Sequence, residues 1–130
     1  MAVTGINHIN VRTSDISWSA AFFEDVLGLK FRETPLPQGR TGCWLYDSND
    51  NPIIHLRLKE AEGESTGALD HVALNCANRT TVVGALKSRG IDYRLIDNMV
   101  TDGLTQLFFT DIHGITWELN FNNDEEHSSL

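Results

Sequence analysis

The sequence has few cysteines and prolines, few basic residues and no long apolar run. Its 130 residues include 2 Cys and 3 Pro. Cys43 and Cys76 form no Cys-x-x-Cys motif, so we expect neither a disulfide framework nor a thiolate zinc site, and a reducing, cytoplasmic location is predicted. No stretch approaches the roughly 18 apolar residues of a membrane span, and the N-terminus lacks a signal-peptide pattern. With 18 acidic and 10 basic residues and a formal charge of −8, nucleic acid is not an expected partner.

The remaining composition is that of one folded domain. Hydrophobic residues make up 41% and charged residues 22% of the chain. A chain of this length can bury one sizeable core but is too short for two ordinary domains. We therefore expect residues 1–130 to form a single domain.

The chain contains an internal repeat with an offset of 63 residues. The segment INHINVRTSD at 6–15 aligns with LDHVALNCAN at 69–78, and NPIIHLRL at 51–58 aligns with GITWELNF at 114–121. The paired residues include four potential metal ligands and three aromatic residues: His8 with His71, His55 with Glu118, Trp44 with Leu107, and Tyr46 with Phe109.

Each half of the repeat predicts a strand, a helix and three further strands. Helices are expected at 16–27, ending at Gly28, and near 80–89, ending at Gly90. Strands are expected near 6–12, 29–33, 43–47, 53–58, 70–75, 91–96, 105–110 and 115–121. This predicts module one at 5–58, a polar linker at 59–68, module two at 69–121 and a disordered acidic tail at 122–130. The predicted fold is α+β, with two tandem βαβββ modules forming a half-open eight-stranded barrel-like sheet whose exposed edges favour a homodimer.

Strand alternation places four potential metal ligands on the face opposite the apolar residues. They are His8, His55, His71 and Glu118. One such histidine is more often structural, but three histidines and a glutamate at two equivalent positions favour a metal site. Imidazole and carboxylate ligands suit Fe(II), Mn, Co, Ni or Zn. His113 is interpreted as a turn residue and His127 as part of the tail.

Two further polar residues share this predicted face. Asn10 is expected to orient ligands or substrate, with exposed polar surface as the plainer alternative. Arg57, two residues past His55, is expected to bind a substrate carboxylate, with a salt-bridged wall residue as the alternative.

These segments resemble the vicinal oxygen chelate superfamily, which includes glyoxalase I, fosfomycin-resistance transferases, bleomycin-binding proteins and extradiol dioxygenases. The resemblance covers residues 6–121 and is carried by NHINVRTSDISWSAAFFEDVLGLKF, LDHVALN and FFTDIHGITWELNF. It implies the tandem βαβββ fold and a metal site with a ligand from the first and last strand of each module. Those positions are His8, His55, His71 and Glu118.

The resemblance favours a metal-dependent enzyme acting on a small substrate held through vicinal oxygens, with a slight lead for extradiol-dioxygenase-like chemistry. These dioxygenases use two histidines and one glutamate, matched by His8, His71 and Glu118, and an acid–base histidine in a place comparable to His55. Phe108 stands where they have a tyrosine, and we expect it to contact substrate. Fosfomycin transferases share the three-ligand pattern, but their potassium loop has no counterpart here.

Two alternatives remain. Bacterial glyoxalase I resembles the chain in having an arginine four residues beyond the first ligand, matched by Arg12, which there binds a substrate carboxylate. In such an isomerase His55, where that enzyme usually has glutamate, would be a fourth ligand and Glu118 the catalytic base. The other alternative is a metal-free protein that binds a drug between aromatic walls. Whether the site forms within one chain or between two chains is open at this stage.

Overall fold

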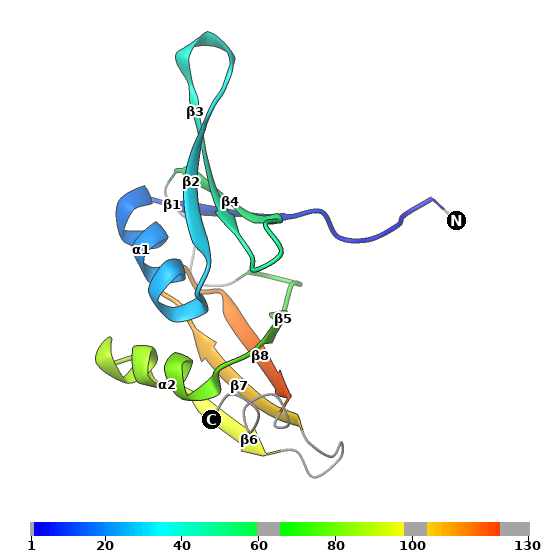
Figure 1. The fold of residues 1–130 in the computed structure, drawn as a ribbon, viewed down its shortest axis with the longest axis vertical. Helices are drawn as coiled ribbons and strands as arrows, with labels where there is room; N and C mark the ends of the chain where they lie inside the picture. The colour runs from blue at the N-terminus through cyan, green and yellow to red at the C-terminus, as the bar shows by residue number, and fades with distance from the viewer. Residues whose placement is uncertain (1, 60–65, 98–103, 123–130) are drawn as a thin grey trace. The chain divides into compact units, whose positions relative to one another are not determined.

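The computed structural model describes residues 2–59, 66–97 and 104–122, and the chain divides into two compact units, Met1–Glu62 and Gly63–Leu130 (Figure 1). Each unit has the element order βαβββ and forms its own four-stranded sheet. The α+β class and the tandem βαβββ modules expected from the repeat are therefore confirmed.

Module one consists of β1 (Ile9–Thr13), α1 (Ile16–Leu27), β2 (Lys30–Pro35), a short 3-10 turn (Pro37–Gly39), β3 (Thr41–Tyr46) and β4 (Pro52–Leu58). The sheet order is β1-β4-β3-β2, with β1 parallel to β4 and the other pairs antiparallel. The parallel pair requires a crossover connection, and α1 lies on that connection and contacts β2, β3 and β4.

Local signals set the ends of α1. The Asp15 carboxylate accepts the N–H of Trp18 at 2.9 Å and caps the first turn. Gly28 ends the helix in the left-handed region at φ 67°, which glycine adopts without strain. The inward face of the helix buries Phe22, Phe23 and Val26.

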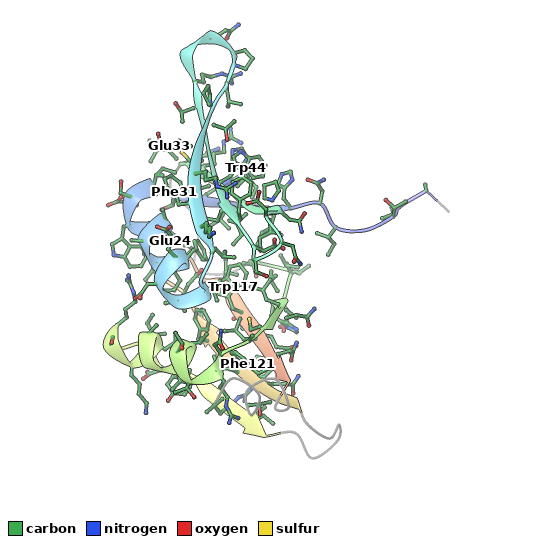
Figure 2. The ribbon with its side chains drawn as sticks, in the orientation of Figure 1. Glu24, Phe31, Glu33, Trp44, Trp117 and Phe121 are labelled. Carbon is green, nitrogen blue, oxygen red and sulfur yellow. The ribbon has the colours of Figure 1, made fainter. Side chains whose placement is uncertain are left out.

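Module two repeats this plan with β5 (Val72–Cys76), α2 (Arg79–Ser88), β6 (Arg94–Asp97), β7 (Leu104–Thr110) and β8 (Thr116–Asn122). The sheet order is β5-β8-β7-β6, again with the first pair parallel. Trp117, Leu119 and Phe121 alternate along β8 and are fully buried, and Figure 2 shows Trp117 and Phe121 along this strand.

The turn between β7 and β8 is organised by the buried carboxylate of Asp111. Its Oδ1 accepts the backbone N–H groups of His113 at 2.9 Å and Ile115 at 3.0 Å, and its Oδ2 accepts the indole N–H of Trp117 at 2.9 Å. The interpretation of His113 as a turn residue agrees with this geometry.

Two pairings in the repeat alignment, Trp44 with Leu107 and Tyr46 with Phe109, are wrong by one residue; Phe109 pairs with Trp117 as Leu45 pairs with Ile54. The alignment placed Trp44 on Leu107, but Trp44 pairs across the sheet with His55, as Phe108 pairs with Glu118. A β-bulge where β3 pairs with β4 shifts the register between Leu45 and Tyr46 and accounts for the extra residue. Because a one-residue shift moves a side chain to the other face, the counterpart of Trp44 is Phe108.

Other differences concern element ends. His8 and His71 each lie one residue before their strands, β1 and β5. Asn122, predicted to begin the tail, is the last residue of β8, while residues 123–130 and linker residues 60–65 lie outside the described residues. Within the described part of the chain, no helix has the length and apolar character needed to cross a membrane.

Candidate functional site

Module one brings together His8, His55 and Trp44. His55 lies on β4 between Asn10 of β1 and Trp44 of β3. The Trp44 ring, labelled in Figure 2, stacks on the imidazole of His55 with ring centroids 4.3 Å apart and planes within 4°. The His8 ring approaches edge-on, 4.9 Å from Trp44 and 6.3 Å from His55. The stacked indole fixes the plane of the His55 ring.

The Nδ1 atoms of both histidines in module one face a side-chain amide. Nδ1 of His8 lies 2.6 Å from Oδ1 of Asn7, and Nδ2 of Asn10 lies 3.3 Å from Nδ1 of His55. Burial, followed by electrostatic repulsion from His8 and Arg57, lowers the pKa of His55 and favours its neutral form. Because the Asn10 amide N–H donates to Nδ1, the neutral His55 ring carries its proton on Nε2. Nε2 of His55 becomes free to bind a metal or accept a proton when the Asn10 amide is turned so that its oxygen faces Nδ1.

Module two brings together His71 and Glu118. Nε2 of His71 lies 3.6 Å from Oε1 of Glu118, and Nδ1 of His71 lies 2.8 Å from Oδ2 of Asp70. The amide of Asn120 donates to Oε2 of Glu118 at 2.9 Å. The hydrogen bond to Asp70 raises the pKa of His71. Desolvation, the second-largest effect, opposes this rise, and the negative charges of Glu118 and Asp70 add to it.

The donor set fits a divalent metal ion. Two ligand atoms about 2.1 Å from one ion, at angles of 90–120°, lie about 3.0–3.6 Å apart, and the 3.6 Å between His71 and Glu118 is at the upper end of that range. Metal-ligating histidines usually have the second ring nitrogen bound to a carboxylate or amide oxygen, as Asp70 and Asn7 provide for His71 and His8. Each module contributes two expected ligands, and among the described residues no group of three or more His, Cys, Asp and Glu side chains is placed to hold an ion.

The two arginines expected to bind substrate lie side by side in module one. Arg12 of β1 pairs in register with Arg57 of β4, and both side chains are exposed. Within the described ranges neither arginine forms an ion pair. Asn10, the other predicted substrate contact in module one, faces His55.

A cavity of about 750 Å³ lies beside the ligand pair of module two. Phe108 lines it together with His71 and Glu118, and its ring meets the His71 ring edge-on at 6.4 Å. The guanidinium of Arg94, also lining the cavity, lies 5.1 Å from the centre of the Phe108 ring.

The sequence predictions did not include Trp44 or Arg94 among the site residues. Both are recognised from cross-strand register, because Trp44 pairs with His55 and Arg94 pairs with Phe108, which in turn pairs with Glu118. Period-two alternation alone places residues on a face but does not show which strands are neighbours.

Each of the two βαβββ modules carries one pair of candidate ligands at equivalent positions. The protein is therefore of the class built by internal duplication. The family model of the Glyoxalase/Bleomycin resistance protein/Dioxygenase superfamily matches residues 5–119. The chain belongs to this superfamily, which confirms the resemblance drawn from its sequence motifs.

Solved structures share the fold at low sequence identity. FosX, a fosfomycin resistance protein from Listeria monocytogenes complexed with Mn(II) and sulfate, has a TM-score of 0.69 and 15% identity, over 92% of this chain and 91% of FosX. A glyoxylase/bleomycin resistance protein/dioxygenase domain from Frankia sp. EAN1pec has a TM-score of 0.69 and 15% identity, with 97% of both chains covered. TnmS3, an antibiotic binding protein from Streptomyces sp. CB03234, has a TM-score of 0.66 and 19% identity, over 94% of this chain and 98% of TnmS3. No curated protein matches the sequence.

Proposed function

We propose that the chain is a divalent-metal-dependent enzyme whose small substrate binds through two neighbouring oxygens. His8, His71 and Glu118 are the proposed ligands, and Fe(II), Mn, Co, Ni or Zn is the proposed cofactor. The supporting observation is the 3.6 Å approach of His71 Nε2 to Glu118 Oε1, with the outer atom of each side chain held by Asp70 and Asn120. The similarity of fold to a Mn(II) complex of FosX is consistent with this proposal. A bound ion would act as Lewis acid and template.

The reaction we favour is oxygenative ring opening of a catechol-like substrate, in which His55 takes a proton from a substrate hydroxyl. A general base must be held in place, and the stacked Trp44 ring fixes the plane of the His55 ring. Turning the Asn10 amide so that its oxygen accepts from Nδ1–H would make Nε2 the basic nitrogen. Phe108, beside His71 and Glu118, would support the substrate ring.

Glyoxalase-like isomerisation is the second candidate, favoured by one observation. His55 occupies in module one the strand position that Glu118 occupies in module two, each opposite an aromatic residue. His55 would then be a fourth ligand, and Glu118 would be the base that moves a proton between adjacent carbons.

Metal binding is the first test of the proposal. Protein purified without chelator should contain stoichiometric divalent metal by elemental analysis. Titration of stripped protein with Mn(II) should show affinity that falls at least tenfold in His71→Ala and in Glu118→Gln. His113→Ala is the matched control, because His113 lies in the β7–β8 turn and should leave Mn(II) affinity unchanged. Absence of metal, or equal Mn(II) affinity in all four proteins, would refute the proposal and favour a metal-free binding protein.

His55→Ala distinguishes the two reactions. If His55 is an acid–base residue, Mn(II) affinity should persist and ring-cleavage absorbance should be lost when oxygen is added to anaerobic protein, Fe(II) and a catechol panel. A tenfold loss of metal affinity would instead indicate the isomerase. Trp44 gives an independent signal: its fluorescence should change on metal binding if the stacked His55 is a ligand, and Trp44→Phe should remove that change.

We also propose that the 130 residues act as one domain and that two chains pair into a homodimer. Each sheet has two edge strands, β1 and β2 in module one and β5 and β6 in module two, and such edges favour pairing with a second chain. Light scattering after size exclusion should give twice the 14.5 kDa of one chain. A monomer mass at micromolar concentration would refute the dimer.

A further inference from the structure

A row of three side chains runs across the sheet of module two. Glu118 of β8 pairs with Phe108 of β7, and Phe108 pairs with Arg94 of β6. All three line the cavity of about 750 Å³ that His71 also lines. The strands β8 and β6 are two positions apart, so their backbones are separated by about 10 Å, close to the length of a substituted one-ring molecule.

The equivalent row in module one shows what is unusual about Arg94. There the row is His55, Trp44 and Arg32. The Arg32 guanidinium is bound to Asp50 at 2.6 Å and lies 4.4 Å from the centre of the Tyr46 ring, so its role is structural. Arg94 contacts Phe108 but forms no ion pair with any residue that the structure describes.

The charges around the cavity indicate which ligand group Arg94 could bind. The cavity lining includes the carboxylates Asp70, Asp92 and Glu118, and Arg94 is its only Lys or Arg among the described residues. Asp92 lines the same cavity without forming an ion pair with Arg94. A guanidinium presents a planar fork of N–H donors that fits a carboxylate through two parallel hydrogen bonds.

We propose that Arg94 is a specificity-determining residue that binds a carboxylate of the substrate at the end opposite its chelating oxygens. The substrate class is then a small organic acid with two vicinal oxygens at one end and a carboxylate at the other, lying along Glu118, Phe108 and Arg94. This inference rests on the proposed metal-dependent function of the same site.

Equilibrium binding to Mn(II)-loaded protein under argon tests the inference with two probes, catechol and 3,4-dihydroxybenzoate. The probes share the chelating oxygens and differ by the carboxylate. Arg94→Met should weaken binding of 3,4-dihydroxybenzoate at least tenfold and that of catechol less than twofold, measured by calorimetry. Arg94→Lys should recover part of the loss, because it retains the charge without the fork.

Arg32→Met is the matched control, since Arg32 holds the equivalent register position and is bound to Asp50. It should leave the affinity for both probes unchanged. The inference is overturned if Arg94→Met weakens both probes equally or neither, or if the carboxylate-dependent loss appears in Arg57→Met instead. Failure of the protein to bind Mn(II) would refute the proposed function and this inference together, whereas Mn(II) and catechol binding without an Arg94 effect would refute this inference alone.

Discussion

Asp111 is predicted to be a principal stabilising residue of module two. Its carboxylate is buried and accepts three hydrogen bonds, two from the turn and one from the indole of Trp117, which is fully buried. Asp111→Asn preserves the shape of the side chain but replaces one acceptor oxygen with an N–H₂ donor. Either the two backbone N–H groups or the indole N–H then loses its acceptor.

The expected cost follows from the number and burial of these bonds. Leaving one buried donor unsatisfied costs about 1–3 kcal/mol, and the bonds that remain become weaker because the acceptor is no longer charged. We expect Asp111→Asn to lower the free energy of unfolding by about 2–4 kcal/mol and Asp111→Ala by about 3–5 kcal/mol. With a urea dependence of about 2 kcal/mol per molar, the Asn variant should unfold at about 1–2 M less urea.

Urea unfolding followed by far-ultraviolet circular dichroism measures this shift without depending on tryptophan fluorescence. A double-mutant cycle with Trp117→Phe isolates the indole bond, because phenylalanine has no N–H to satisfy. In that background Asp111→Asn should cost about 1–3 kcal/mol less than in the wild-type chain. An unchanged urea midpoint for Asp111→Asn, or the same cost in both backgrounds, would refute the assignment of the carboxylate as the clamp of the β7–β8 turn.

Three further predictions concern other parts of the chain. Gly84→Ala in α2 should stabilise the protein by about 0.5–1 kcal/mol in urea unfolding, since an added Cβ meets no atom within 4 Å, and a decrease would contradict this. Burial raises the pKa of Cys76 to about 11, so iodoacetamide at pH 8 should modify Cys43 first by mass spectrometry, and faster labelling of Cys76 would be inconsistent with its burial. The hydrogen bond from the backbone N–H of Asn51 lowers the pKa of Asp47 in the folded protein. The charged Asp47 carboxylate therefore stabilises the fold at pH values above its pKa in the unfolded chain, which is about 3.9. This stabilisation is lost as the pH falls through the pKa of Asp47 in the folded protein. Asp47→Ala should therefore lower the urea midpoint at pH 7 but not near pH 2. Equal shifts of the midpoint at both pH values would show that the stabilisation does not depend on the ionisation of Asp47.

The faces of the strands could be predicted from the sequence because burial imposes a period of two. Ile54 and Leu56 are buried on either side of the half-buried His55, and Trp117 and Leu119 flank Glu118 in the same way. The polar residue between two buried residues is thereby assigned to the opposite face. This reasoning predicted the face of His55 and of Glu118, whereas His8 and His71 each lie one residue before a strand.

The pairing of strands could not be predicted with the same accuracy. A single bulge between Leu45 and Tyr46 moves the counterpart of Trp44 from Leu107 to Phe108, and nothing in the local pattern marks the bulge. The contact of Arg94 with Phe108 depends on the register of β6 against β7, which the local pattern does not show either. Residues identified by their cross-strand neighbours were for this reason missing from the predicted site.

One signal was present in the sequence and was not used. The repeat places Asn7 on Asp70, directly before His8 and His71, and in each case the side-chain oxygen lies against Nδ1 of the histidine. Because an adjacent Asn or Asp can reach this nitrogen in both modules, the Asx-His pair predicts the orientation of the ring as well as its position.

The two modules retain equivalent positions and differ in the groups placed there. His55 corresponds to Glu118 and Asn10 to Ala73, whereas Arg32 and Arg94 are the same residue type and differ in that Arg32 is bound to Asp50 and Arg94 forms no ion pair with a described residue. Strand register preserves the positions because a shift would move apolar side chains out of the core, whereas a side chain on the opposite face can change without that cost. Positions on this face where the two modules have different side chains therefore carry more information about function than positions where both modules have the same side chain. By this criterion Glu118 is the informative substitution in its row, and Arg94, at the other end of that row, differs from Arg32 in its ion pairing and not in its residue type. Under the proposed function, exchange of these two side chains should most change which small molecule the protein binds.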